Sequence, residues 1–214
     1  MRSLRNFEFV VDLILKERLY CAHYSTLNDP FEGIYLSVTH LPPTLLRRKG
    51  TQRVSRENPS RLYEQEKYCR VCSLSDSFED LRMWSQYADG HKGIAIEIAF
   101  RGYEEDVTPV RYLDELKKYS NTVLGTPFPE EVLSQKTIHW MHEREFRILQ
   151  ADEYYSVKGR IKAIYLGERV SEKHKDLLEE IVPDSIPIRV ARINPTTLKV
   201  EPVVGRKSEA PSAA

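Results

Sequence analysis

The clearest element of the sequence is the run IAIEIAF, which extends from Ile94 to Phe100. Its bulky apolar residues stand at every second position and alternate with alanine and glutamate, and a period of two is typical of a β-strand with one buried face. Glu97 therefore points away from that face. Gly90 precedes the strand, and we expect it to end a helix there in the left-handed conformation.

Outward from this strand, helical and extended segments follow one another without a regular rhythm. Helices are predicted at residues 7–16, 78–87, 129–138 and 171–181, and strands at 18–25, 68–75, 107–112, 145–149, 160–166, 187–193 and 197–200. Between them we expect an ordered loop at 26–33, a short extended or helical return at 34–39 and a long excursion with one helix at 41–68.

This order of elements indicates the α+β class. It favours a twisted, largely antiparallel sheet system flanked by helices over a doubly wound parallel sheet. We expect a single domain over residues 1–205 and a disordered tail at 206–214.

Composition limits the partners of the chain. Lys and Arg together number 32, as do Asp and Glu, so the formal net charge is zero and no global field holds the protein on nucleic acid or an anionic membrane. Charged residues such as Glu8, Asp12 and Lys16 interrupt the N-terminal apolar runs, which fits neither a signal peptide nor a membrane span. Three cysteines, an odd count, indicate no secreted disulfide framework. We therefore expect a cytoplasmic protein with no membrane partner.

Two segments carry short polar side chains that can bind a ligand. The segment NDPFE contains the carboxylates of Asp29 and Glu32, although Asn28 or Asp29 can equally serve as a loop cap. The segment CSLS, read as a strand, places Ser73 and Ser75 on one face, where two hydroxyls can bind a sugar or a phosphate. The alternative for these serines is a cap of the helix that follows.

The segment MWSQYADGHKG carries a third group of candidates. Trp84 and Tyr87 share one stripe of the predicted helix, which is ordinary core behaviour, although either ring can also stack on a ligand. His91 lies in a turn bounded by glycines, so we expect its ring near the surface, as a ligand contact or as an acid or base.

The fourth group lies in the segment WMHEREFRI. If this segment enters a strand, Glu143, Glu145 and Arg147 project to one face. Such a face is either a salt-bridge network or a site in which one carboxylate is kept ionised by the arginine and the other is poised for proton transfer.

Signals for metal binding are weak. Cys69 and Cys72 have the spacing of a metal or redox pair, but no second pair accompanies them, and a strand would turn the two sulfurs to opposite sides. His139 and His142 can share a helical face without an obvious third ligand. We therefore expect no metal.

The four segments, in this order, resemble the bacterial family catalogued as domain of unknown function 2971. The resemblance extends from about the first helix to the strand that contains Leu166 and Gly167. The matching residues are Leu19-Tyr20, Leu27 to Glu32, Cys72 to Ser75, Met83 to Ala88, His91 to Gly93, Lys136, Trp140, Glu143, Glu145 and Arg147. The family name implies no reaction.

We further hypothesise a similarity to ADP-ribosyltransferases of the class that uses an arginine, a serine motif and a glutamate. In that class a Ser-x-Ser strand supports the nicotinamide ribose of NAD and a Glu-x-Glu motif acts at the sugar. The similarity implies that Glu145 binds the ribose hydroxyl and stabilises the positive charge developing on the sugar, while Glu143 activates a protein or nucleic-acid acceptor. The class also uses a first-strand arginine for the phosphates, and here the chain begins almost at the first helix.

The candidate site that follows has three catalytic and seven binding residues. The catalytic candidates are Glu145, Glu143 and His91, and the cofactor-binding candidates are Ser73, Ser75, Trp84, Tyr87, Asn28, Asp29 and Arg147.

Three other classes remain open. A non-catalytic module can use the same residues to recognise a nucleotide or a partner. A nuclease or other hydrolase can use Asp29, Glu32, Glu97 and Glu143 as metal ligands. An interaction protein without a small ligand would show an apolar surface patch.

Overall fold

A computed structural model of the chain describes residues 1–4, 7–40, 55–62, 70–120 and 127–204. Their contacts divide the chain into two compact units. Unit 1 comprises Met1–Tyr20, Ser75–Glu105 and Tyr154–Ala214, and unit 2 comprises Cys21–Leu74 and Asp106–Glu153. The expected tail at 206–214 and most of the excursion at 41–68 lie outside the described residues.

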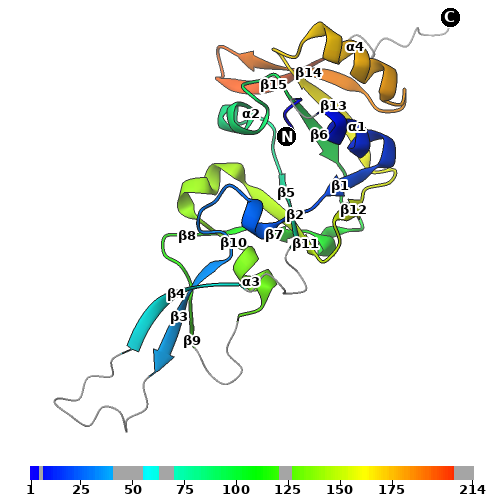
Figure 1. Cartoon of the computed structure of the whole chain (residues 1–214). Coiled ribbons are helices and arrows are strands. Elements are labelled where there is room, and N and C mark those ends of the chain that lie inside the picture. Colours follow the sequence, from blue (N-terminus) through cyan, green and yellow to red (C-terminus); the bar gives the residue numbers. More distant parts are fainter. Residues whose placement is uncertain (5–6, 41–54, 63–69, 121–126, 205–214) are drawn as a thin grey trace, which may run out of the picture. The chain divides into compact units, whose positions relative to one another are not determined.

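Unit 1 is built on a four-stranded sheet with the order β15-β14-β13-β6 (Figure 1). Its elements are α1 (Phe7–Lys16), β1 (Arg18–Tyr20), α2 (Leu81–Tyr87), β6 (Ile94–Ile98), β12 (Tyr154–Ser156), β13 (Ile161–Gly167), α4 (Glu172–Ile181), β14 (Ile188–Asn194) and β15 (Lys199–Val204). The strand pair β13 and β14 is parallel and is connected through α4, whereas β13–β6, β14–β15 and β1–β12 are antiparallel.

The core of unit 1 lies where α2 packs against this sheet. Trp84 is fully buried there, and its indole N–H donates to the carbonyl of Phe78 at 2.5 Å. The Phe78 ring stacks on Tyr165, whose hydroxyl donates to Glu97 at 2.6 Å. Glu97 is exposed, as the alternation in β6 predicts.

Unit 2 contains three small sheets (Figure 1). Their orders are β2-β5-β11-β7, β4-β3-β9 and β10-β8. The elements are β2 (Ala22–His23), η1 (Tyr24–Thr26), β3 (Ile34–His40), β4 (Ser55–Arg61), β5 (Arg70–Ser75), β7 (Thr108–Pro109), β8 (Arg111–Leu113), β9 (Lys118–Ser120), α3 (Pro129–Leu133), β10 (Gln135–Thr137), η4 (Ile138–Glu143) and β11 (Glu145–Gln150); η3 (Glu104–Asp106) lies at the boundary of the units. A core of buried side chains, among them Tyr24, Tyr35 and Leu133, holds the unit together.

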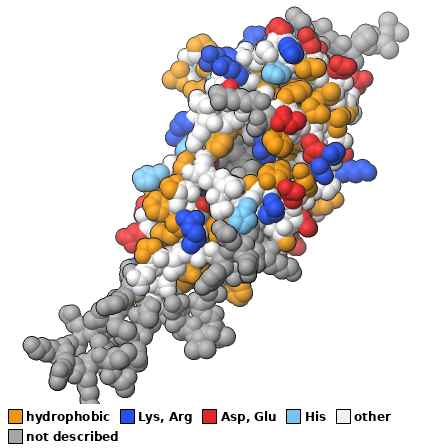
Figure 2. Space-filling model, viewed as in Figure 1, with side chains coloured by type: hydrophobic (Ala, Val, Ile, Leu, Met, Phe, Trp, Pro, Cys, Tyr) orange, Lys and Arg blue, Asp and Glu red, His pale blue; other side chains and the backbone are white. Residues whose placement is uncertain are grey.

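The α+β class with largely antiparallel sheets is confirmed. The helices at 7–16 and 171–181 are confirmed as α1 and α4, the latter with Ser171 as its N-cap. Gly90 adopts the expected left-handed conformation, with φ of +64°. On the face drawn in Figure 2, acidic and basic side chains are interspersed. In the described part of the chain, no helix combines the length and apolar character that a membrane span requires.

Several predicted boundaries are wrong because strand partners far along the chain determine them. The predicted strand at 18–25 divides at Cys21 into β1 and β2, which pair with β12 and β5, and then ends in the short helix η1. The predicted strand at 107–112 divides in the same way into β7 and β8. Where the excursion at 41–68 is described, residues Ser55–Arg61 form strand β4.

The helix predicted at 129–138 ends at Leu133. Residues Gln135–Thr137 instead form β10, which pairs in parallel with β8 and places Lys136 opposite Tyr112. On this strand, Lys136 pairs with the buried carboxylates of Glu143 and Glu145.

Candidate functional site

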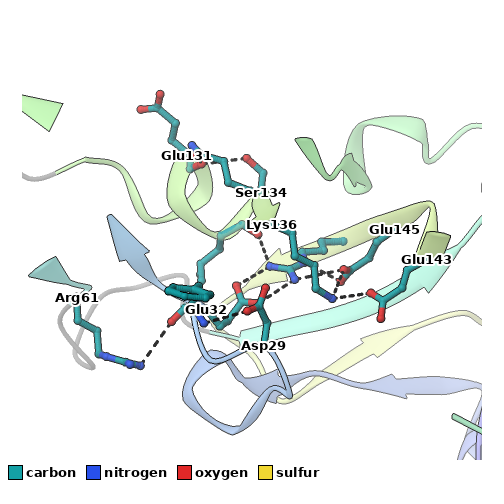
Figure 3. Close-up of polar contacts among 12 residues, drawn as sticks. Asp29, Glu32, Arg61, Glu131, Ser134, Lys136, Glu143 and Glu145 are labelled. Atoms are coloured by element: carbon teal, nitrogen blue, oxygen red, sulfur yellow. Dashed lines mark hydrogen bonds and ion pairs between the residues drawn. The ribbon is translucent and has the colours of Figure 1, made fainter. Parts of the chain in front are cut away.

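Five buried charged side chains of unit 2 alternate in sign along a chain of ion pairs, which we call the charge ladder: Glu143, Lys136, Glu145, Arg147 and Glu32. The Lys136 ammonium lies 2.5 Å from Glu143 and 3.0 Å from Glu145 (Figure 3). The Arg147 guanidinium donates from Nε to Glu145 at 2.7 Å, and from its two terminal nitrogens to the carboxylate of Glu32 at 2.6 and 2.8 Å. Each of the two bases therefore joins two carboxylates.

Local backbone geometry brings the two glutamates of the Glu-x-Glu motif to the same lysine. Glu143 is the last residue of η4, and Glu145 is the first residue of β11. Between them Arg144 adopts a left-handed conformation with φ of +46°, which is uncommon for a residue with a Cβ. Arg147 follows Glu145 by two positions on the same strand, so both side chains project to one face. The prediction that Glu143, Glu145 and Arg147 come together is confirmed, although Glu143 lies before the strand.

Glu32 reaches the ladder from a turn of unit 2 that is fixed by its own hydrogen bonds. The carboxylate of Asp29 accepts from the backbone N–H of Phe31 at 2.9 Å, and the Asp29 carbonyl accepts from that of Glu32 at 3.0 Å. Gly33 closes the turn with φ of +70°. Asp29 thus has the capping role that was one of its two interpretations, and it is buried.

Burying the five charges of the ladder costs free energy, because each charge loses its contact with water. The five side chains are only 1–4% exposed, so each charge depends on its partners in place of water. Three carboxylates face two bases, which leaves one surplus negative charge when all are ionised. Such a surplus favours either a bound proton or a cationic group nearby.

The pKa values of the carboxylates diverge because their partners differ. Burial by itself would raise the pKa of Glu145, but the charges and hydrogen bonds of Arg147 and Lys136 outweigh burial and lower this pKa to about 2. For Glu32 burial outweighs the attraction of Arg147, and its pKa is raised. Burial would lower the pKa of Lys136, yet Glu145 and Glu143 raise it. Glu145 is therefore the permanently ionised centre of the ladder, and Glu32 is a carboxylate that burial drives towards the neutral form.

Three further side chains hold the centre of the ladder. Ser73 lies on β5, the strand next to β11 in the sheet, and contributes to lowering the pKa of Glu145. The hydroxyl of Tyr112 accepts from the backbone N–H of Glu145 at 2.7 Å. The Lys136 ammonium lies 4.7 Å from the centre of the Trp140 ring, which is a cation–π distance.

A small hollow that opens to solvent lies beside the ladder within unit 2. Its walls combine apolar side chains with a few polar groups, and Lys136 is shared with the ladder. The lining residues are Asp29, Phe31, Ile34, Leu113, Glu115, Leu116, Val132, Gln135, Lys136 and Thr137. Half of these residues are apolar and half are polar or charged, so the hollow presents both kinds of surface.

The remaining candidates lie outside the ladder: Ser75, Trp84 and Tyr87 belong to unit 1, and Asn28 belongs to unit 2. Ser75 is the first residue of the second segment of unit 1, and its hydroxyl donates to the carbonyl of Ser77, so it stabilises a local turn. Trp84 is a core residue, as its ordinary interpretation predicts, and Tyr87 is half-buried. Asn28 precedes the turn that carries Glu32 and is exposed.

The expected surface position of His91 is wrong. Its side chain is 7% exposed and stacks on Trp84 with ring centres 5.7 Å apart, because a left-handed backbone with φ of +67° turns the ring inward. Its Nδ1 is buried without a hydrogen-bond partner in the described part of the chain. Burial lowers the pKa of His91, so the ring is neutral near pH 7.

The four carboxylates proposed as metal ligands are not arranged as a metal site. Within the described residues, no group of three or more His, Cys, Asp and Glu side chains can hold a metal ion. Both carboxylate oxygens of Glu32 are bonded to Arg147.

Comparison with known proteins returns nothing: no protein-family model, no curated protein and no solved structure matches the chain.

The sequence did not reveal the roles of two members of the ladder. Lys136 was noted only within the family resemblance and was placed in a helix. Glu32 was noted as a carboxylate of its loop, within the resemblance and as a metal ligand, but not as the partner of Arg147. Arg147 and Glu32 are 115 residues apart in the chain, so only the folded sheet brings them together. The signal available in the sequence was the excess of charged residues inside otherwise apolar segments.

Proposed function

We propose that the protein is an NAD-using enzyme of the ADP-ribosyltransferase type, with its site in unit 2 and Glu145 as its centre. One observation carries the proposal: β5, which holds the Ser-x-Ser motif, lies next to β11, which begins at Glu145 of the Glu-x-Glu motif, and Ser73 is among the groups that lower the pKa of Glu145. The two motifs are separated by about 70 residues in the chain, and the fold brings together their functional members. The same motifs support a proposed membership of the family of domain of unknown function 2971.

The electrostatics of the ladder suit the chemistry. Cleavage of the bond between the ribose carbon and the nicotinamide nitrogen leaves the electron pair on nicotinamide and positive charge on the sugar. A carboxylate with a pKa of about 2 stays ionised and stabilises this charge in a site from which water is excluded. The acceptor then attacks the sugar carbon and gives up its proton, for which Glu143 is the candidate base.

Lys136 holds the site together in the absence of substrate. Its ammonium lies against both Glu143 and Glu145, so it compensates the negative charge of these buried carboxylates when no substrate is bound. In this proposal the positive charge of the nicotinamide ribosyl group takes over part of that electrostatic role. The hollow beside Lys136 gives the ligand its approach.

A second candidate is a non-catalytic binding module. It is favoured by the burial of Glu145, whose side chain is 3% exposed and has both oxygens bonded to bases. In that case the ladder is a rigid support and the hollow is the binding site.

The test uses the full chain, labelled NAD and host lysate, with nicotinamide release and label transfer as readouts. Glu145→Gln should reduce both by about 100-fold or more, as expected when an electrostatic stabiliser of the transition state is lost. The matched control is Glu131→Gln, because Glu131 is a carboxylate of unit 2 outside the ladder, paired with Lys117 at the surface. Absence of both turnover and NAD binding in the unsubstituted protein would overturn the enzyme proposal. NAD or nucleotide binding without turnover would establish the binding module.

A further inference from the structure

Two cysteines of unit 2 face each other across the strand pair β2–β5. The register of this antiparallel pair places Ala22 opposite Val71 and His23 opposite Arg70. One step further in the same register places Cys21 opposite Cys72. Opposed residues of an antiparallel pair project to the same face, so the two thiols lie side by side.

The contacts of the two side chains agree with this register. Cys21 and Cys72 are 0% and 3% exposed, and their thiols share a hydrogen bond. The Cys21 sulfur also accepts from the side-chain amide of Gln150 at 3.3 Å. The backbone of Cys21 is fixed on both sides, because its N–H donates to the Glu153 carbonyl at 2.8 Å and its carbonyl accepts from Arg70 at 3.1 Å.

This geometry matches what a disulfide needs. Directly opposed residues of an antiparallel pair have Cα atoms roughly 4.5–5.5 Å apart, within the range of roughly 4.4–6.8 Å found for disulfides. The bond can therefore form with little movement of the backbone.

We propose that Cys21 and Cys72 are a redox pair that forms a cross-strand disulfide with a low-molecular-weight disulfide as oxidant. One thiol loses its proton and attacks the oxidant, which releases one small thiol and leaves a mixed disulfide. The second cysteine thiol loses its proton and attacks the protein sulfur of that intermediate, which releases the other small thiol. The protein loses two protons and two electrons, and the oxidant gains both.

The surroundings determine when the pair reacts. The hydrogen bond to Cys72 and burial raise the pKa of the Cys21 thiol, so the reactive thiolate is scarce at neutral pH. Oxidation should be slow near pH 7 and accelerate as the pH rises. Oxidation would link the residue directly before β2 to β5, the strand that carries Ser73. This inference is independent of the proposed enzymatic activity.

The test is to incubate the reduced full chain with oxidised glutathione at several pH values, block the remaining thiols and map the linked peptides by mass spectrometry. The expected result is a Cys21–Cys72 link, a mass lower by two hydrogen atoms, and a rate that increases with pH. Cys69→Ser, which removes the third cysteine of the sequence, should leave the link intact. Cys21→Ser and Cys72→Ser should each abolish it.

Peptide mapping of the unsubstituted protein keeps the proposal testable if a cysteine variant fails to fold. The oxidised protein should melt roughly 8–16 °C above the reduced protein, since closing a loop of about 50 residues stabilises a chain of this size considerably. Glutathione adducts without the internal link, or a link through Cys69, would overturn the proposal.

Discussion

Replacing Arg147 with methionine removes the base that joins Glu145 to Glu32 in the charge ladder while keeping a side chain of similar length. Arg147 is 1% exposed and forms four charge-assisted hydrogen bonds, two to Glu32 and two to Glu145. A fifth bond, at 2.6 Å, goes to the carbonyl of Leu133. Without the guanidinium, two buried carboxylates and a carbonyl lose their main partner.

The expected cost is about 3–5 kcal/mol, the usual consequence of leaving a buried charge uncompensated. For a chain of this size that corresponds to a melting temperature lower by roughly 6–20 °C. Urea unfolding followed by circular dichroism measures the free energy of unfolding, and an unchanged slope shows that the change is in stability. Glu32→Gln combined with Arg147→Met should recover part of the loss, because one of the two stranded charges is gone.

The matched control is Arg82→Met. Arg82 also contacts a carboxylate, that of Asp80 at 2.6 Å, but its side chain is 65% exposed. An exposed pair of this kind contributes only about 0–1 kcal/mol. If Arg147→Met cost no more than Arg82→Met, the ladder would not be a buried network of interdependent charges, and the reasoning about Glu145 would fail with it.

Three further changes test separate parts of the structure. The Glu145→Gln variant should be less stable than the unsubstituted protein, and this difference in the free energy of unfolding should shrink as the pH falls from about 5 towards 2. The reason is that the pKa of Glu145 is about 2 in the fold against an ordinary 4.5, so the stabilisation by its charge, roughly 3 kcal/mol, is complete only above the ordinary value. Equal differences at pH 6 and pH 2.5 in urea titrations would contradict this. Lys136→Met should cost about 3–5 kcal/mol near pH 7, since two buried carboxylates lose their ammonium, and a near-neutral effect on urea unfolding would show that they are protonated. Gly33→Ala places a Cβ 2.4 Å from the Tyr24 ring at a positive φ and should cost clearly more than Gly102→Ala, where φ is also positive but the space is open; equal melting temperatures would refute the contact.

The sequence predicted best those elements whose signal is local. The helix at 7–16 has apolar residues at helical spacing and polar residues on the other side, and its bounds are confirmed as α1. The strand beginning at Ile94 was predicted from strict alternation. The helix at 129–138 failed beyond Leu133 because pairing of β10 with β8 outweighs the local preference around Lys136.

For the candidate site, grouping was easier to predict than contact. Glu145 and Arg147 lie two positions apart on β11, so their shared face could be predicted from strand periodicity, whereas Glu143 lies before the strand and reaches Lys136 through the left-handed Arg144. The partner of Arg147 could not be predicted, since Glu32 lies 115 residues earlier in the chain. The buried position of His91 accompanies a left-handed backbone, and a histidine at this position does not predict that conformation.

The path of the chain through the two units bears on how the protein is synthesised. Unit 2 is complete once the ribosome has added Glu153, whereas unit 1 still lacks β13, β14 and β15 at that point. The strand β6 is synthesised much earlier than β13, its antiparallel partner, so this pairing forms only after β13 has been synthesised. Unit 2 can therefore fold on the nascent chain while the apolar edge of β6 remains without its partner. A chaperone that binds exposed apolar strands during translation would meet this protein through residues Ile94–Ile98.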